Sequence, residues 1–531
     1  MKPTRRIKRI NGIEYWYEET PYYDPVSKQT RHTSRYLGRN VDGEPVRMRS
    51  APDEVIAMIR KPEVAVVRSS FDYGSIFLLQ QNLQDLHLDQ YLNELLSETE
   101  VAMVTALTFN RLIRPLAMNH IDAWYAGTTL ALDGPAISLS GQRISELLEK
   151  IGTSNIPDAL MGRLLAENNT QRTLVYDITS LSSYSSLIQL LEYGYSRDAL
   201  TLPQINLSLI MDKDLGIPVM YDIYPGSITD VTTLTGTLTR LEAYGISDCT
   251  AIMDRGFFSQ NNLREMLDRQ ISFIIAAKFS LKELKELLTE EQRDIDQVVY
   301  LQKFHGQTIY AKPVVFALGD HLLKGYLYYD PKREQEEREA LTSRLHDIRE
   351  ALLNVRLKKN QSAYHVFSEK AGKLKNFFDW NQVENRIEVT IRQNAVTQRT
   401  NRMGKYMLFY SGDVDWMTCL SRYRERDCIE KEFKGLKSEL ETLPLRTHST
   451  ATTRGYLFIA FLSLILRSRL LGVMKESGLA KKYSVEGVLL ELEKWRKVTL
   501  ADGRVMMTEM TKKQRTILEA LDLMRLISPG D

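Results

Sequence analysis

Hydrophobic and polar residues alternate in the first part of the chain and change to a helical spacing further on. Up to about residue 50, short alternating runs flank turn signals such as NGIEYWYEE and YYDPVSKQT, a pattern typical of short strands. Between residues 74 and 168, stretches such as LLQQNLQDLHLDQYLNELL carry apolar residues three and four positions apart, which predicts helices. We therefore expect a small β region over residues 1–73 and a helical domain or linker over residues 74–168.

Strand and helix patterns alternate over residues 169–280. LVYDITSLSSY predicts a strand, INLSLIMDKDLGIPVMYDIYPG a hairpin, VTTLTGTLTRLEAYG a helix and CTAIMDRGF another strand. The helix SQNNLREMLDRQ and the strand SFIIAAK follow. Strand, strand, strand, helix, strand is the order of a ribonuclease H-like fold, although other folds share it. We expect an α/β protein whose core resumes over residues 404–475, where YMLFYSGD predicts a strand.

Residues 281–403 interrupt this alternation and predict an insertion in the core. Strand-like runs such as TIYAKPVVFAL and GYLYYD precede a long charged helix, from about Lys332 to Lys359, and more strand-like sequence follows. Within the helix, apolar residues from Leu341 to Val355 recur at steps of four and three. Such a stripe packs on its own domain or forms a dimer seam, and packing on its own domain is the favoured interpretation. We expect a largely β subdomain that interrupts the core.

Charge is distributed unevenly, although the 531 residues carry a net charge of only +2. Residues 1–50 hold eleven Lys or Arg against six Asp or Glu, mixed with Tyr and Trp. This composition suits a nucleic-acid surface, which makes residues 1–73 a candidate DNA-binding region. It equally suits a small sheet with solvated charges. Residues 356–405 hold eleven Lys or Arg against four acids. Such an excess of positive charge suits phosphate groups, and Arg392, Arg399 and Arg402 are the candidate contacts if they face a nucleic acid.

Several classes of protein are disfavoured by composition. The cysteines Cys249, Cys419 and Cys428 are too few and too scattered for a disulfide framework or a zinc site, which suits a reducing compartment. The amino terminus lacks the apolar segment of a signal peptide, and YLFIAFLSLIL falls short of the roughly 20 apolar residues of a membrane span. We expect a cytoplasmic protein without membrane contact, with YLFIAFLSLIL in a buried core helix and residues 476–531 helical.

Two aspartates occupy matching positions in the predicted sheet. Asp177 and Asp254 each follow a short apolar run, LVY and AIM, in a predicted strand. Either residue alone could be a turn former or a helix cap. If the strands are neighbours, the two carboxylates meet at one edge of the sheet, where Glu430 could join them from a helix. Three carboxylates so close require a hard cation such as Mg²⁺, and two such ions about 4 Å apart support phosphodiester chemistry.

Glu430 belongs to a charged stretch, RYRERDCIEKEFKGLKSEL, that predicts one helix. On a straight helix Tyr423, Arg426, Glu430 and Lys437 fall within an arc of about 60°. A solvated helix face would have the same charges, but this spacing also collects an aromatic ring, a guanidinium, a carboxylate and an ammonium on one face. Arg426 could grip a phosphate bidentately, Lys437 could hold another, and Tyr423 could stack or donate a hydrogen bond.

These four residues fit a spacing of Tyr, two residues, Arg, three residues, Glu, six residues, Lys. The spacing resembles the signature of DDE transposases from bacterial insertion sequences, in the branch that cuts and pastes through DNA hairpins. GYSRDALTLPQINLSLIMDKDLGIPVMYDIYPGSITD and MDRGFFS are similar to that family's regions after the first aspartate and around the second. The similarity runs from about Val175 to Leu466. One departure is Gly226-Ser227, where such proteins often have Gly-Asn.

The resemblance implies a ribonuclease H-like core with Asp177, Asp254 and Glu430 as the DDE triad. It implies that these carboxylates bind two Mg²⁺ ions, for which Mn²⁺ can substitute, and that Tyr423, Arg426 and Lys437 contact DNA. The implied partners are double-stranded DNA, as terminal inverted repeats and target, and a second copy of the chain in a synaptic complex.

The activity expected from this resemblance is cut-and-paste transposition by metal-dependent cleavage at transposon ends and strand transfer into target DNA. A ribonuclease H-like nuclease or recombinase without strand transfer is an alternative, and a domesticated DNA-binding protein without catalysis is another. In hairpin-forming relatives an aromatic residue of the insertion holds a flipped base. Trp380 and Trp416 match no motif of this kind and are not assigned to the site.

Overall fold

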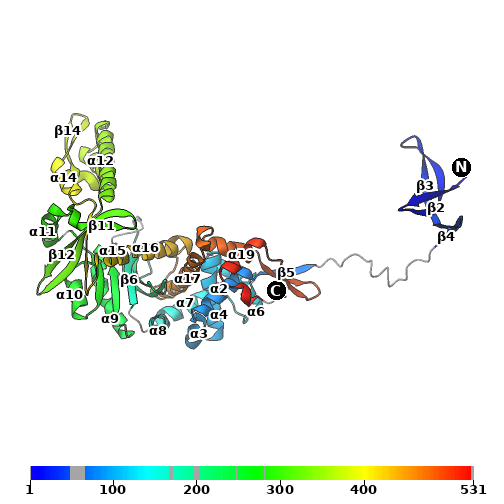
Figure 1. Ribbon diagram of the computed structural model, residues 1–531, viewed down its shortest axis with the longest axis horizontal. Coiled ribbons are helices and arrows are strands. Elements are labelled where there is room, and N and C mark those ends of the chain that lie inside the picture. The colour runs from blue at the N-terminus through cyan, green and yellow to red at the C-terminus, as the bar shows by residue number, and fades with distance from the viewer. Residues whose placement is uncertain are drawn as a thin grey trace. The chain divides into compact units, whose positions relative to one another are not determined.

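The computed structural model divides the chain into two compact units. The structure describes residues 2–47, 66–166, 172–194, 202–228, 230–246, 248–279 and 281–527. The first unit comprises residues 1–67 with 500–502, and the second comprises residues 68–499 with 503–531 (Figure 1).

The first unit contains a four-stranded antiparallel sheet in the order β1-β2-β3-β4. Its strands are β1 (Thr4–Ile10), β2 (Ile13–Asp24), β3 (Gln29–Val41) and β4 (Glu44–Val46). The β1–β2 turn at Asn11-Gly12 has two positive φ angles, 51° and 82°, which the Asn-Gly pair tolerates at low cost. The rings of Tyr15 and Tyr17 lie 6.0 and 5.6 Å from that of Tyr36, so one face of the sheet is aromatic.

A nine-stranded mixed sheet forms the centre of the second unit, in the order β11-β12-β13-β16-β10-β9-β6-β7-β8. Strands β6 (Arg172–Ser182), β7 (Gln204–Asp212) and β8 (Ile217–Pro225) are antiparallel neighbours. Beyond them β9 (Cys249–Met253) and β10 (Ser272–Ala276) run parallel to β6. Numbered along the chain, these five strands lie in the order 3-2-1-4-5, as expected for a ribonuclease H-like core. Between them lie α9 (Asp230–Ala243) and α10 (Gln260–Asp268).

The first part of the predicted insertion belongs to this sheet and not to a separate subdomain. Strands β11 (Leu301–Phe304), β12 (Gln307–Leu318) and β13 (His321–Tyr329) form antiparallel pairs, and β13 pairs with β16 (Lys405–Tyr410), which pairs with β10. The expectation of a largely β insertion over residues 281–403 is therefore wrong in this respect. An alternating pattern predicts a strand, but it does not identify the sheet that the strand joins.

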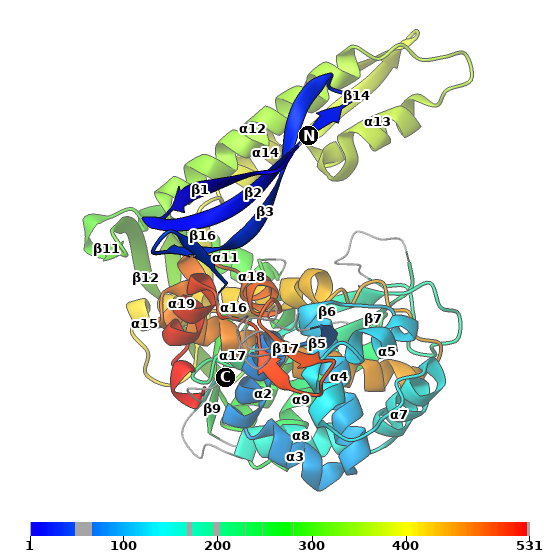
Figure 2. The same ribbon diagram turned by 90° about the vertical axis from the view of Figure 1, so that its right-hand side faces the viewer.

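The remaining insertion is a mainly helical lobe that projects from the sheet (Figures 1 and 2). It contains α12 (Pro331–Leu353), α13 (Ala363–Ala371), α14 (Gln393–Thr400) and the hairpin of β14 (Phe378–Val383) with β15 (Arg386–Ile391). Leu345 and Leu352 of the apolar stripe are buried against Phe367, Phe378 and Ile387. The stripe therefore packs within its own lobe, the favoured interpretation of the sequence.

The helical region of residues 74–166 packs around a long central helix, α17 (Thr450–Glu476) (Figure 2). The region comprises α2 (Gly74–Asp85), α3 (Leu88–Leu95), α4 (Glu98–Ile113), α5 (Ile121–Tyr125), α6 (Thr129–Asp133), α7 (Gly141–Thr153) and α8 (Ile156–Ala166). A Cβ on Gly455 would lie 2.0 Å from the carbonyl oxygen of Leu148, so glycine lets α17 approach α7 closely. Among the described helices, α17 alone is long and apolar enough to cross a membrane, but 72% of its most apolar window is buried inside the protein, as for a core helix.

The carboxyl-terminal region contains strands as well as helices, so the expectation of an entirely helical region is wrong. Between α18 (Val485–Leu492) and α19 (Lys512–Ala520) lies a hairpin of β17 (Arg496–Leu500) and β18 (Val505–Met507). The hairpin forms a three-stranded sheet with β5 (Val67–Asp72), a strand from the opposite end of the sequence.

Candidate active site

The two predicted aspartates are neighbours where the parallel pairing of β6 with β9 ends. Tyr176 of β6 pairs with Met253 of β9, so the next residues, Asp177 and Asp254, follow side by side at the spacing of adjacent strands, about 4.8 Å. β9 ends at Met253, and Asp254 is followed by a short 3-10 helix (Arg255–Phe257). Beneath the site, the rings of Tyr176 and Phe257 lie 4.8 Å apart and are buried. The strand register thus fixes both aspartates.

The charged stretch RYRERDCIEKEFKGLKSEL, predicted as one helix, falls on two helices and a π-turn that follows them. Helix α15 (Trp416–Arg424) ends before α16 (Asp427–Lys434) begins, and residues Gly435–Glu439 adopt π geometry. The expected straight helix is therefore wrong. Despite the break, Tyr423 lies near Asp254, with its hydroxyl donating to Asp254 Oδ1 at 3.4 Å.

Asp177, Asp254 and Glu430 line one cavity of about 290 Å³, together with Arg426. The Arg426 guanidinium donates from Nη1 to Asp177 Oδ2 at 3.4 Å and from Nη2 to Glu430 Oε1 at 2.7 Å. Asp177 is 16% exposed, whereas Glu430 is 55% exposed. Three carboxylates and one guanidinium thus share a single opening.

The charge of Arg426 is maintained by the groups around it. Burial lowers the pKa of Arg426, but the nearby groups of Tyr423, Asp254, Asp177 and Glu430 raise it by more, and the net shift of its pKa is upward. Burial, followed by the charge of Asp254, raises the pKa of Tyr423. Tyr423 therefore remains a neutral hydrogen-bond donor beside Asp254, and Arg426 remains the cation of the cavity.

The donor chemistry of the cavity fits a hard divalent cation, because carboxylate oxygens are the ligands that Mg²⁺ prefers. Within the described ranges, however, no three His, Cys, Asp or Glu side chains lie close enough together to hold one ion. Arg426 lies between Asp177 and Glu430 and forms an ion pair with each of them.

Lys437 does not line the carboxylate cavity, contrary to the expected common face. It lines another cavity, of about 860 Å³, between the helical region and the core. The physical reason is the helix geometry: the chain breaks before Asp427, and the π-turn that contains Lys437 advances fewer degrees per residue than an α-helix. Extrapolation along an ideal helix therefore misplaces the last of the four residues.

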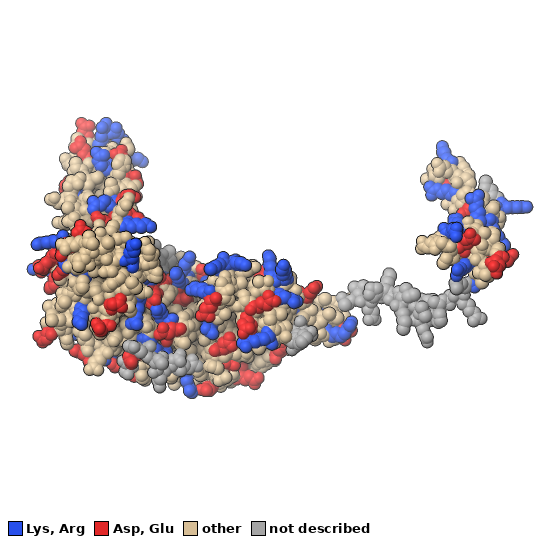
Figure 3. All heavy atoms as spheres, viewed as in Figure 1, with Lys and Arg blue, Asp and Glu red and all other residues tan. Residues whose placement is uncertain are grey.

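A larger cavity, of about 1,110 Å³, extends from Asp254 and Glu430 towards the projecting lobe. Arg399 and Arg402 line it, whereas Arg392 does not and instead pairs with Asp379 at 2.6 Å. Basic residues that the sequence did not single out also line it: Arg255, Lys278, Lys285, Arg333, Lys405 and Arg424. Figure 3 shows Lys and Arg side chains interspersed with Asp and Glu on the lobe and the adjoining surface. No common spacing links these residues, so the sequence offers no signal for them.

The two tryptophans that match no motif lie outside these cavities. The ring of Trp380 stacks on Phe367 with centroids 5.1 Å apart, inside the lobe. The backbone carbonyl of Trp416 accepts a hydrogen bond from the Tyr328 hydroxyl at 2.7 Å. Both tryptophans therefore have structural contacts.

Comparison with protein families gives one match, to the transposase DDE domain, over residues 169–466. This match covers more than half of the chain. The chain belongs to this family. The DDE domain assigns it DNA transposition as its function and makes it a phosphoryl-transfer enzyme. The matched range contains Asp177, Asp254 and Glu430, and also the projecting lobe.

The chain also has distant similarity to solved structures. One is the piggyBac transposase synaptic complex with hairpin DNA, with a TM-score of 0.35 and 10% identity, covering 87% of this chain and 81% of that chain. Another is the Drosophila P element transposase strand transfer complex, with a TM-score of 0.17 and 12% identity, covering 73% of this chain and 87% of that chain. No curated protein matches the chain. The family assignment therefore depends on the DDE domain alone.

Proposed function

We propose that this DDE domain protein is the transposase of a bacterial insertion sequence, of the cut-and-paste branch with the Tyr-Arg-Glu-Lys signature. Asp177, Asp254 and Glu430 are its catalytic residues. The observation that carries the proposal is the register of β6 and β9, which sets Asp177 and Asp254 side by side in a cavity that Glu430 also lines.

The three carboxylates are the proposed ligands of two Mg²⁺ ions, with Mn²⁺ as a substitute. When bound, such ions activate an attacking oxygen and stabilise a leaving oxygen at a phosphodiester. Arg426, displaced from the carboxylates, is in position to bind a DNA phosphate with two N–H donors. Tyr423 orients Asp254 through its hydroxyl.

The proposed reaction begins with hydrolysis at the transposon end, which breaks one phosphodiester and frees a 3′ hydroxyl. That hydroxyl attacks the opposite strand, which closes a hairpin and releases the flanking DNA. A second water hydrolyses the hairpin and frees the 3′ hydroxyl again, and this hydroxyl later attacks target DNA. Each step breaks one P–O bond and forms another, so one set of carboxylates serves all of them. The substrate is double-stranded DNA, as terminal inverted repeats and as target.

The basic residues around the larger cavity support DNA binding next to the carboxylates. Arg399 and Arg402 reach it from the lobe, and Arg424 from α15. The basic, aromatic sheet of the first unit is a second proposed DNA contact. We further propose that the protein acts as a homodimer in a synaptic complex, in the bacterial cytoplasm and on its nucleoid.

A strand-transfer assay tests the proposal. The purified protein is incubated with Mg²⁺, a labelled duplex carrying the DNA end that flanks its reading frame, and a target plasmid. The unsubstituted protein is expected to join the labelled end to the plasmid. Asp177→Asn is expected to give no joined product. Cleavage without joining would indicate a nuclease without strand transfer. Binding without cleavage would indicate a domesticated DNA-binding protein.

A further inference from the structure

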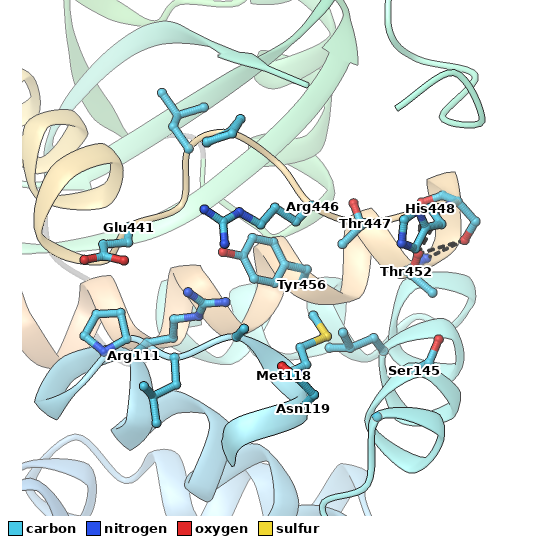
Figure 4. A pocket seen from close by; sticks show the side chains of 18 of the residues that line it. Arg111, Met118, Asn119, Ser145, Glu441, Arg446, Thr447, His448, Thr452 and Tyr456 are labelled. Atoms are coloured by element: carbon cyan, nitrogen blue, oxygen red, sulfur yellow. Dashed lines mark hydrogen bonds between the residues drawn. The ribbon is translucent and has the colours of Figure 1, made fainter. Parts of the chain in front are cut away.

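The cavity that contains Lys437 is open and basic, and the catalytic proposal does not use it. It is lined by α4, α7, the segment of residues 441–449 and the first turns of α17. Figure 4 shows Arg111 and Arg446 beside the ring of Tyr456, with Met118 and Asn119 across the cavity. The Arg111 guanidinium lies 4.8 Å from the centre of the Tyr456 ring. Two arginines from distant parts of the sequence thus meet at one aromatic side chain.

Neither arginine is neutralised by a carboxylate. Among the described residues, Arg111 and Arg446 form no ion pair and no side-chain hydrogen bond, whereas Arg143 of α7 pairs with Glu146 at 3.2 Å. The two acids of the lining, Glu149 and Glu441, are exposed. An unpaired pair of guanidinium groups beside apolar walls is suited to an anion, and to a phosphate in particular.

The cavity has a fixed relation to the catalytic aspartate through the strand β6. Leu445 forms a parallel bridge with Ser183, its N–H donates to the Ser182 carbonyl at 3.1 Å, and its carbonyl accepts from Ser183 Oγ at 2.8 Å. Arg446 is the next residue along the chain. Asp177 lies five residues before Ser182 on the same strand, a separation of roughly 17 Å for extended backbone.

This backbone separation can be expressed in nucleotides of DNA. Nucleotides on one strand are spaced at about 3.4 Å along the helix axis, so roughly 17 Å corresponds to about five nucleotides. We propose that the cavity binds a backbone phosphate of the DNA held at the catalytic cavity, about five nucleotides from the bond that is cut, with Arg446 and Arg111 as the ligands. This inference depends on the proposed function, and it names a contact of the same substrate.

Free nucleotides carry the same chemical groups, but the site favours DNA. Arg446 is exposed, and the π-turn with Lys437, which also lines this cavity, directly follows α16, the helix that carries Glu430. A polymer that occupies the catalytic cavity brings its next phosphates to the second one at high effective concentration. A mononucleotide gains no such advantage.

The salt dependence of DNA binding tests the inference. Fluorescence anisotropy with a labelled duplex of the native transposon end gives the affinity over a range of KCl concentrations. Arg446→Ala should lower the slope of log affinity against log salt by about one unit, and the double variant with Arg111→Ala by about two. Arg143→Ala is the matched control, because it removes an arginine from α7 outside the cavity, and its slope should equal that of the unsubstituted protein.

Ethylation interference locates the contact. For the unsubstituted protein, a modified phosphate about five nucleotides from the cut should weaken binding, and Arg446→Ala should lose that signal. A slope unchanged in both variants, with normal cleavage, would overturn the inference and leave the proposed function intact. Tight binding of dAMP that Arg446→Ala abolishes, with an unchanged DNA slope, would also overturn it, in favour of a nucleotide site. An unsubstituted protein that binds no DNA would overturn both proposals.

Discussion

The aspartates and the glutamate of the cavity are held by backbones of different kinds. Asp177 and Asp254 follow paired residues of two parallel strands, deep in a sheet whose neighbouring side chains are buried. Glu430 lies on an eight-residue helix between a break and a π-turn, with more than half of its side chain exposed. The difference indicates that the aspartates form a rigid half of the site and the glutamate an adjustable half.

Removal of either rigid carboxylate should have the largest effect. Asp177→Asn and Asp254→Asn each remove a proposed metal ligand worth several kcal/mol in the transition state, so cleavage should fall by about a thousandfold or more. Cleavage of the labelled end duplex measures this loss, with a thermal melt to check folding. Asp268→Asn, an exposed carboxylate on α10, is the control and should retain full activity. Cleavage by Asp177→Asn at the rate of the Asp268→Asn control would refute the assignment of the triad.

Changes of side-chain length should separate the two halves of the site. Asp177→Glu lengthens the side chain by one methylene on a strand that cannot shift, so the carboxylate is misplaced. A misplacement of about 1 Å costs about a hundredfold in rate, and a loss of this size is expected. Glu430→Asp shortens the side chain on a short, half-exposed helix that can adjust. The cleavage rate should therefore fall by about tenfold, less than for Asp177→Glu. Single-turnover cleavage rates give both numbers. Equal losses would show that Glu430 is held as rigidly as Asp177.

The same contrast explains which parts of the fold and site could be predicted. The order of β6 to β10 and the setting of Asp177 and Asp254 follow from local apolar runs, because a strand and the residue after it are local features. The position of Lys437 required a continuous helix, which the break before Asp427 and the π-turn do not provide. The pairing of β13 with β16, and of β5 with β17, depends on contacts between distant segments, for which one sequence carries no local signal.

Arg426 connects the two halves of the site, and its removal should make the protein depend on metal for stability. Its guanidinium, 14% exposed, is the cation that lies between Asp177 and Glu430. Arg426→Ala leaves three carboxylates without a counter-charge, and the metal-free protein should lose about 1–3 kcal/mol of stability. Thermal melts with and without Mg²⁺ measure this. Mg²⁺ should raise the Tm of the variant more than that of the unsubstituted protein, and equal shifts would show that Arg426 does not compete with the ion.

The smallest expected effect concerns the lobe, the part of the second unit that projects furthest from the sheet. Arg399 and Arg402 line the cavity next to Asp254 and Glu430, whereas Arg392 of the same lobe is paired with Asp379. Each phosphate contact contributes about one unit to the slope of log affinity against log salt. The double variant Arg399→Ala with Arg402→Ala should therefore flatten the slope by about two units and slow cleavage several-fold, while Arg392→Ala should leave both unchanged. Anisotropy titrations in KCl with the end duplex measure the slopes. If Arg392→Ala flattens the slope as much as either cavity variant does, Arg392 also contacts a DNA phosphate. The DNA-binding surface of the lobe would then extend beyond the cavity that Glu430 lines.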